Sequence, residues 1–321
     1  MVDLDREEHE LLARIARRWY YDRRTQGEIA IEFGLSRPKV QRLLDRARTT
    51  GVVEVHIEMP MGLDLDLEQQ FVDVFGLKAA LVSPSVSDPD EQRSLVARRA
   101  AGHLEQLLVD SSVVAISHGR DIGAVPRHFR PSNDIDCLFA SAMGGSPKVD
   151  APTNPNEICR SLAERCSGRA ESLYAPAYVE SEEVRDQLLA QDAVAHALKV
   201  AAGADVGLVG IGGTDDNCTM VRSGCLTRAE VRTLRKQGAV GDVLGNYVDI
   251  DGEHIVAPHS GRLIGLSIND LRSIPTVVAV VSGQEKPRAI LGVLRAGIVD
   301  VLIVDESNAQ QVLDLVQKGG D

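Results

Sequence analysis

Hydrophobic positions near the start of the chain recur at helical spacing in three short segments. Apolar residues occur as adjacent pairs every four positions in residues 11–20, as one face in residues 29–33, and as an i, i+3, i+4, i+7 stripe in residues 40–47. The positions in these groups are Leu11, Leu12, Ile15, Ala16, Trp19 and Tyr20; Ile29, Ala30 and Phe33; and Val40, Leu43, Leu44 and Ala47. This pattern predicts three helices that pack against one another.

The junction between the second and third helices has the residues of a tight turn. Gly34 can adopt the left-handed backbone conformation that ends a helix, and the side-chain oxygen of Ser36 is expected to cap the next one. Lys39, Arg42 and Arg46 then share the face opposite the apolar stripe. These features are typical of a helix-turn-helix, whose second helix can enter the major groove of DNA.

Charge is distributed unevenly along the chain. Residues 12–50 contain ten Lys or Arg and four Asp or Glu, whereas the whole chain carries a formal net charge of −12. The alternative interpretation is a small helical bundle whose basic side chains only face solvent. A cationic segment on an acidic protein favours phosphate binding instead, because the remaining surface repels a polyanion. We therefore predict that the chain binds double-stranded DNA.

Side-chain chemistry selects the candidate DNA contacts. Arg37 and Arg42 suit two-point contact with guanine, Gln41 suits adenine, and Lys39 suits a phosphate or a guanine. The start of the preceding helix can offer side-chain and backbone donors to phosphate. The predicted DNA-binding residues are Thr25, Gln26, Ser36, Arg37, Pro38, Lys39, Gln41 and Arg42.

The pattern changes near residue 60, where a proline and a glycine interrupt the chain. Apolar and polar residues alternate in 52–58, as in a short strand. Apolar residues recur at helical spacing in 63–75, and Gly76 ends that pattern. We predict a helix-turn-helix domain at residues 1–60 and a larger domain at residues 61–321. The helix at 63–75 is a candidate connector or dimer contact.

From residue 79 onward, apolar runs of strand length alternate with helical patterns. The predicted strands are 79–83, 112–117, 137–143, 205–211, 276–282 and 300–305, and the predicted helices are 91–108, 156–167, 182–201, 227–236, 287–296 and 307–317. Such alternation predicts an α/β fold with a parallel sheet covered on both faces. Small ligands bind such sheets in the loops at the carboxyl ends of the strands.

Composition narrows the function classes. Aromatic residues make up only 3% of the chain, which disfavours a base-stacking surface for single strands. The five cysteines form no CxxC pair and have no histidine at ligand spacing, so neither a disulfide framework nor a metal site is predicted. The acidic N-terminus and the lack of a long apolar run indicate a cytoplasmic protein that does not enter a membrane. No GxGxxG follows a first strand, so no cofactor is predicted.

The chain resembles the SorC family of sugar-responsive bacterial transcriptional regulators over nearly its whole length. The matching residues in the helix-turn-helix are Tyr20, Tyr21, Gln26, Glu28, Ile29, Ala30, Ser36, Arg37, Pro38, Val40, Arg42, Leu43 and Leu44, and the matching segments beyond it are 210–212, 238–252, 282–286 and 289–306. The resemblance implies a large Rossmann-like effector domain similar to sugar-phosphate isomerases. It also implies a homo-oligomer, either a dimer or a tetramer, whose DNA binding changes when a sugar derivative binds.

The same resemblance locates an effector site. Family members that bind phosphorylated sugars carry Trp-Gly-x-Thr where this chain has His118, Gly119, Arg120 and Asp121. A carboxylate at the threonine position repels phosphate and accepts hydrogen bonds from hydroxyls, which favours a neutral sugar or sugar alcohol. The alternative is a phosphorylated sugar, because Arg120 and Lys286 match the family pattern and either could neutralise Asp121.

Other positions complete the candidate effector site. Lys148 lies in a loop where one relative responsive to deoxyribose phosphate forms a Schiff base, but nothing near it in the sequence indicates an activated lysine, so a solvated loop lysine is the favoured interpretation. Asp249 lies near sugar hydroxyls in the family and also suits a hairpin turn. The predicted effector-binding residues are His118, Gly119, Arg120, Asp121, Gly144, Gly145, Lys148, Gly212, Asp249 and Lys286.

Two other function classes are open from the residues alone. An isomerase or deaminase would need a carboxylate base paired with an acid, and His118, Asp121 and Lys286 could supply one, but no spacing demands it. We therefore predict no catalytic residue. A nucleoid protein is disfavoured because the large domain is acidic.

Overall fold

The computed structural model describes residues 6–53, 64–146, 153–257, 259–283 and 286–318 of this chain. The chain divides into two compact units, Met1–Met61 and Gly62–Asp321. The predicted strand at 52–58 lies mostly outside the described residues. The two units are described separately below.

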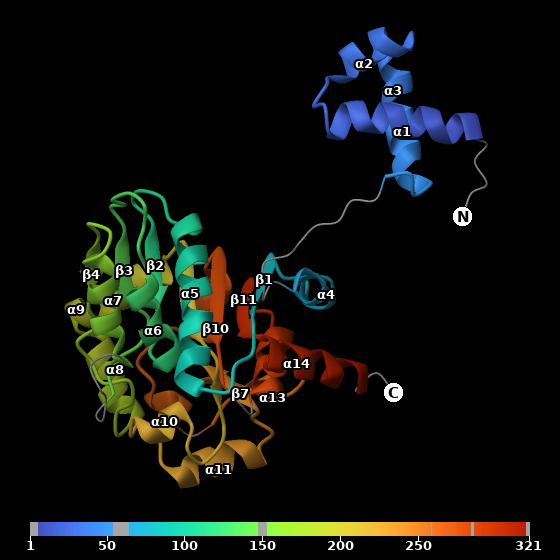
Figure 1. Ribbon diagram of the computed structural model, residues 1–321. Helices are drawn as coiled ribbons and strands as arrows, with labels where there is room; N and C mark the ends of the chain where they lie inside the picture. The colour runs from blue at the N-terminus through green and yellow to red at the C-terminus, as the bar shows by residue number, and fades with distance from the viewer. Residues whose placement is uncertain (1–5, 54–63, 147–152, 258, 284–285, 319–321) are drawn as a thin grey trace. The chain divides into compact units, whose positions relative to one another are not determined.

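The first unit contains the three predicted helices (Figure 1). They are α1 (Arg6–Tyr20), α2 (Gln26–Phe33) and α3 (Arg37–Thr49). The buried side chains in this unit are Leu12, Ile15, Ala16, Ile29, Ala30, Val40, Leu44 and Ala47. All of these positions lie on the predicted apolar faces, so the helical spacing of apolar residues was enough to locate the core of this unit.

The ends of these helices confirm one prediction and differ from the predictions in two places. Gly34 ends α2 with φ 64°, as expected for a left-handed cap. Ser36 stands at the N-cap of α3, but its side chain makes no capping hydrogen bond, so that prediction is wrong. Trp19 and Tyr20 are 37% and 43% exposed, because the middle turns of α1 supply its part of the core.

The second unit is built on a seven-stranded sheet with the order β1-β11-β10-β5-β2-β3-β4, and every pairing in it is parallel. The strands are β1 (Ala79–Ser83), β2 (Val113–Ile116), β3 (Leu138–Ser141), β4 (Arg169–Glu171), β5 (Val206–Gly210), β10 (Thr276–Val281) and β11 (Val301–Asp305). Six of these coincide with the predicted strands. The missed edge strand β4 has only three residues, which is too short for a periodicity signal.

Helices cover both faces of this sheet (Figure 1). Val278 and Val280 of β10 pack in one cluster with α5 (Pro89–Leu107), α6 (Arg120–His128) and α7 (Pro155–Ala163). The alternate residues of β10 pack in a second cluster with α4 (Leu65–Phe75), α9 (Asp192–Ala202), α12 (Ile268–Ser273), α13 (Pro287–Arg295) and α14 (Glu306–Lys318). Strands buried on both sides must be apolar throughout, which explains why they were visible in the sequence.

Several elements differ from the predictions. The helix expected at 182–201 is two helices, α8 (Glu182–Leu189) and α9, because Gln191 adopts an extended conformation with ψ 127°. Val74, expected on the apolar face of α4, is 49% exposed. Two short helices not predicted, α10 (Thr219–Arg222) and α12, and the predicted α11 (Arg228–Lys236) complete the unit with the 3-10 turn η2 (Ser260–Arg262).

A small antiparallel sheet was also not predicted. Its order is β6-β7-β8-β9, formed by Gly212–Gly213, Gly241–Val243, Asn246–Val248 and His254–Ile255. Its strands have two or three residues each, so neither length nor alternation could identify them. The pairing of β6 with β7 brings the glycine-rich segment after β5 against Asp242.

Strand order also fixes where a ligand can bind. The chain builds outward from β2 through β3 to β4, then returns to place β5 on the other side of β2. Neighbouring strands whose connections leave in opposite directions open a crevice at their carboxyl ends. That crevice lies after Ile116 and Gly210, where the predicted effector residues begin.

Candidate functional site

The outer face of α3 carries the candidate DNA contacts. Arg37, Lys39, Gln41 and Arg42 are all exposed, whereas Val40 on the opposite face is fully buried. A basic helix with one buried and one exposed face can present its polar side chains to a groove while its apolar face keeps it folded. Arg46, expected on the same basic face, forms an ion pair with Glu8 of α1 at 2.8 Å.

Two predicted contacts already have partners within this unit. Thr25 forms a capping box with Glu28: its hydroxyl donates to the Glu28 carboxylate at 2.9 Å and accepts from the Glu28 N–H at 3.3 Å. Gln26 donates to the side-chain oxygen of Gln41, and the side-chain nitrogen of Gln41 donates to Asp45 at 3.2 Å. These bonds fix the start of α2 against α3 and orient the amide of Gln41.

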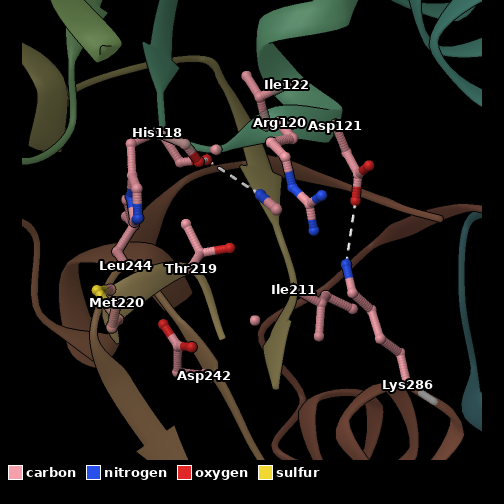
Figure 2. A pocket seen from close by; sticks show the side chains of 14 residues that line it. His118, Arg120, Asp121, Ile122, Ile211, Thr219, Met220, Asp242, Leu244 and Lys286 are labelled. Atoms are coloured by element: carbon pink, nitrogen blue, oxygen red, sulfur yellow. Dashed lines mark hydrogen bonds and ion pairs between the residues drawn. The ribbon is translucent and has the colours of Figure 1, made fainter. Parts of the chain in front are cut away.

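The second unit contains a recess at the carboxyl ends of β2 and β5 (Figure 2). The recess has a volume of about 40 Å³, and it shares Arg120, Thr219 and Lys286 with an adjoining open cleft of about 680 Å³. The cleft is large enough for a sugar derivative, whereas the recess alone holds only a few waters. His118, Gly119, Arg120, Asp121, Gly212 and Lys286 all line the recess.

Asp121 is bonded to the protein rather than free to meet a ligand. Its carboxylate accepts from the hydroxyl of Ser282 at 2.7 Å, from the Ser282 N–H at 3.1 Å and from Lys286 Nζ at 3.1 Å, and Arg93 Nε lies 3.5 Å away. Burial acts to raise the pKa of Asp121, but Lys286 and the Ser282 bonds outweigh it and hold the pKa below its ordinary value. The carboxylate is therefore ionised and neutralised, so the reason for expecting it to repel phosphate does not hold.

Asp242 is the carboxylate that faces the recess without a cationic hydrogen-bond partner. It is 4% exposed, its carboxylate accepts from the N–H of Gly245 at 3.0 Å and from no other described residue, and burial raises its pKa to about 6. A Cβ on Gly212 would lie 2.1 Å from its Oδ1, so only glycine fits beside it. Asp242 can thus offer either an acceptor or, when protonated, a donor to a ligand.

His118 is a neutral side chain at the wall of the recess. Burial lowers its pKa to about 4, and neither ring nitrogen has a hydrogen-bond partner among the described residues. In Figure 2 its ring lies beside Leu244 and Met220. A neutral imidazole can offer one donor and one acceptor to a ligand hydroxyl.

The wall of the open cleft is cationic. Five basic side chains line it, namely Arg120, Arg222, Arg235, Lys286 and Arg288. Arg235 pairs with Asp216 at 2.5 Å and Lys286 pairs with Asp121. The guanidinium groups of Arg120, Arg222 and Arg288 form no hydrogen bond or ion pair within the described part of the chain. Burial, and then the positive charges of Arg222 and Arg93, lower the pKa of Arg120.

Four predicted effector residues lie apart from this recess or outside the described residues. Gly144 packs so closely that a Cβ would lie 2.5 Å from the backbone of Ala175, and Gly145 bonds to the same carbonyl through its N–H. Asp249 closes a turn by accepting from two backbone N–H groups, those of Asp251 and Glu253, both at 2.9 Å. Gly144, Gly145 and Asp249 do not line the recess, and Lys148 is not among the described residues.

The structure adds site residues that the sequence did not single out. These are Thr219, Arg222, Asp242 and Arg288. Asp242 lay within the segment 238–252 that carried the family resemblance, so that match was the available signal. Arg222 is the last residue of the four-residue helix α10 and Arg288 stands in the first turn of α13, where no spacing rule marks a binding residue.

Two further findings concern membrane-spanning helices and metal-binding side chains. No helix in the described ranges is long and apolar enough to cross a membrane. Within the same ranges no three His, Cys, Asp or Glu side chains are grouped so that they could hold a metal ion.

Comparisons with known proteins agree with this architecture. The family described as "Putative sugar-binding domain" matches residues 60–314. The transcriptional regulator LsrR of Klebsiella pneumoniae is 31% identical, and the match covers 96% of this chain and 94% of that protein. The erythritol catabolism regulatory protein EryD of Brucella abortus is 28% identical over 90% of this chain and 92% of its own length. The solved structure of the full-length sorbitol operon regulator SorC from Klebsiella pneumoniae has a TM-score of 0.74 at 25% identity, covering 96% of this chain and 99% of that one.

Proposed function

The chain belongs to the SorC family of sugar-responsive transcriptional regulators, and on that premise we propose that it controls a carbohydrate catabolic operon in response to an anionic sugar derivative. The first unit would bind the operator through α3, and the second unit would bind the effector in the recess and cleft. One observation supports an anionic effector: three guanidinium groups in the cleft form no ion pair among the described residues.

The DNA-binding half of the proposal is supported by exposure and charge. Arg37, Lys39, Gln41 and Arg42 are exposed on one helix of a unit that is rich in cations, on a chain that is otherwise acidic. Thr25, Gln26, Ser36 and Pro38 would contribute at the flanks of that helix. A symmetric dimer or tetramer would place two such helices on a palindromic operator. A protein with this role works in the cytoplasm.

The effector half is supported by electrostatics. Arg120, Arg222 and Arg288 line one cleft and form no ion pair among the described residues, although Asp215 also lines it. Like charges close enough to lower the pKa of Arg120 repel one another. A phosphate group would relieve that repulsion and accept charge-assisted hydrogen bonds from the guanidinium groups. Asp242 and His118 would bind hydroxyls deeper in the recess. A neutral sugar alcohol, favoured by the sequence, leaves these three charges uncompensated.

Catalysis is not part of the proposed function. Proton abstraction needs a carboxylate or imidazole base poised next to the substrate and oriented by a partner. Asp121 is bonded to Lys286 and Ser282, while neither ring nitrogen of His118 has an orienting partner among the residues that the structure describes. Turnover of any sugar phosphate by the purified protein, followed by NMR, would contradict this part of the proposal.

A direct test combines DNA binding with effector titration. Full-length protein is mixed with fluorescent duplexes that tile its own promoter region, at low ionic strength, with each of several sugar phosphates or with the matching unphosphorylated sugar. We expect one duplex to bind, and one phosphorylated sugar to change its affinity while the unphosphorylated partner does not. Failure of every duplex to bind would contradict the DNA-binding half.

Matched arginine variants test the effector half. Arg222→Ala and Arg288→Ala should each weaken sugar-phosphate binding by about ten- to a hundredfold, since a hydrogen bond to a charged group is worth roughly 1.5–3 kcal/mol. Arg98→Ala removes an exposed arginine of α5 that does not line the cleft, and it should bind the effector normally. Equal affinities in all three variants would refute the cleft as the phosphate site.

A further inference from the structure

A second cavity lies at the same edge of the sheet, above the end of β11 and its neighbour β1. Its volume is about 510 Å³. Its walls come from the loop after β1, the first turns of α5, the residue that follows Ser282, and the start of α14. Ser83 and Asp305, the last residues of β1 and β11, stand opposite each other in register. The cavity is therefore formed by the part of the sheet farthest from β3 and β4.

Hydrogen bonds between its walls hold this cavity in shape. Gln92, which is 5% exposed, accepts from the N–H of Val86 at 2.7 Å and donates to the carbonyl of Pro84 at 3.1 Å. The N–H of Ser307 donates to the hydroxyl of Ser85 at 2.8 Å. The loop after β1 is thus bonded to both α5 and α14, so the cavity is formed before any ligand arrives.

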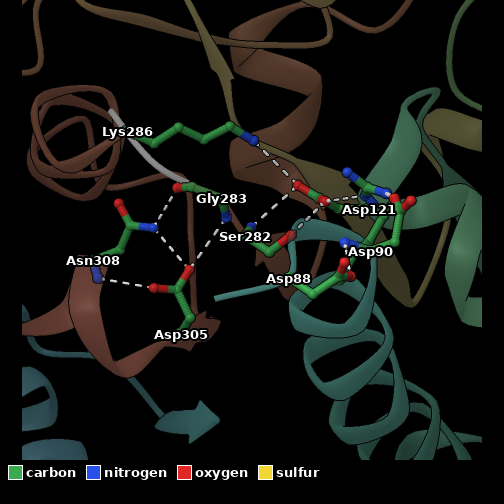
Figure 3. Close-up of polar contacts among 9 residues, drawn as sticks. Asp88, Asp90, Asp121, Ser282, Gly283, Lys286, Asp305 and Asn308 are labelled. Atoms are coloured by element: carbon green, nitrogen blue, oxygen red, sulfur yellow. Dashed lines mark hydrogen bonds and ion pairs between the residues drawn. The ribbon is translucent and has the colours of Figure 1, made fainter. Parts of the chain in front are cut away.

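The floor of the cavity contains a buried acceptor without a partner. Asn308 is 2% exposed, and its amide nitrogen donates to Asp305 at 2.7 Å and to the carbonyl of Gly283 at 2.6 Å (Figure 3). Those two bonds fix which end of the amide is oxygen, and that oxygen has no hydrogen-bond partner among the described residues. A buried acceptor in a cavity wall is satisfied when a ligand or water donates to it.

The lining chemistry defines the ligand. Among the described residues of the lining Asp305 is the only charged one, and these residues include no Lys or Arg, so a phosphate would be repelled. The other polar groups are hydroxyls and amides, including Ser87 and Gln311, and they stand beside the apolar side chains of Val86 and Pro89. Hydroxyl and amide groups next to a small apolar surface suit the hydroxyls and C–H face of a carbohydrate. We propose that this cavity is a second binding site, specific for a neutral polyhydroxylated ligand.

This site is separate from the cationic cleft but adjoins it through two consecutive residues. The N–H and hydroxyl of Ser282 bond to Asp121 at the recess, while the N–H of Gly283 bonds to Asp305 at 3.3 Å (Figure 3). The proposal goes beyond the anionic effector and does not depend on it, because the two sites share no lining residue.

Isothermal titration calorimetry of the full-length protein tests the proposal. The probes are erythritol, ribitol, D-sorbitol, D-ribose and myo-inositol, each titrated at millimolar concentration with and without saturating inorganic phosphate. We expect saturable binding of at least one probe that phosphate does not displace. Absence of binding by all five would overturn the proposal.

Two blocking variants and one control assign the binding to this cavity. Ser87 and Gln311 are exposed at the rim, so Ser87→Trp and Gln311→Trp should fold, as judged by circular dichroism, and each should weaken binding by about tenfold or more. Arg222→Ala, in the cleft, should bind the probe normally. The opposite pattern, with loss in Arg222→Ala and full binding in both tryptophan variants, would place the probe in the cationic cleft and overturn the second site.

Discussion

Asp242 offers a quantitative test of the recess, because burial raises its pKa from 3.8 to about 6. Between these two values the folded protein keeps a proton that the unfolded chain releases. The free energy of unfolding therefore falls as the pH rises through this window, and it levels off once both states are ionised. The full effect corresponds to about two pKa units, or roughly 3 kcal/mol lost above the window.

The substitution Asp242→Asn removes this cost. The amide keeps an oxygen that can accept from the N–H of Gly245, and it stays neutral at every pH. We expect the variant to be more stable than the native protein by roughly 3 kcal/mol near pH 8 and by roughly 1.5 kcal/mol near pH 5, where part of Asp242 is still protonated. The gain should therefore double across this range.

Urea unfolding followed by circular dichroism at several pH values measures the effect. Asp90→Asn is the control, because it removes a carboxylate that is 91% exposed from the same unit and so accounts for the change in net charge. A stability gain for Asp242→Asn that is the same near pH 5 and near pH 8 would refute the raised pKa. A loss of stability at all pH values would show that the ionised carboxylate is needed in the empty site.

Three further predictions concern the rest of the molecule. Arg42→Ala should weaken operator binding by roughly 1–3 kcal/mol in a gel-shift assay, whereas Arg14→Ala on α1 should change it little. Leu44→Ala should destabilise the first unit by roughly 2–5 kcal/mol, because this side chain is 4% exposed in a small core; an unchanged melting transition followed by the fluorescence of the single tryptophan would contradict this. Gly144→Ala should cost roughly 1–3 kcal/mol of stability in thermal unfolding, since its Cβ would lie 2.5 Å from the carbonyl oxygen of Ala175, and native stability would refute that close packing.

The candidate site shows where sequence reasoning succeeds and where it fails. His118 to Asp121 were assigned to the site by the resemblance to the SorC family, and their position directly after a buried strand, where ligands bind, agrees with that assignment. Their chemistry was misjudged at Asp121, because its partners Ser282 and Lys286 are more than 160 positions away in the sequence. The sequence analysis left open that Lys286 neutralises this carboxylate, and only the fold decides for that alternative by bringing the two side chains within 3.1 Å.

The sequence by itself determined the three helices of the first unit, the six long strands of the second, and the excess of positive charge within residues 12–50. Each of these follows from spacing or composition within a few consecutive residues, so local physics is enough to specify it. Only the tertiary structure decided which carboxylate faces the recess and which arginines lack partners. Those properties depend on segments such as β6 and β7, which are too short to be recognised until the parallel sheet brings them together.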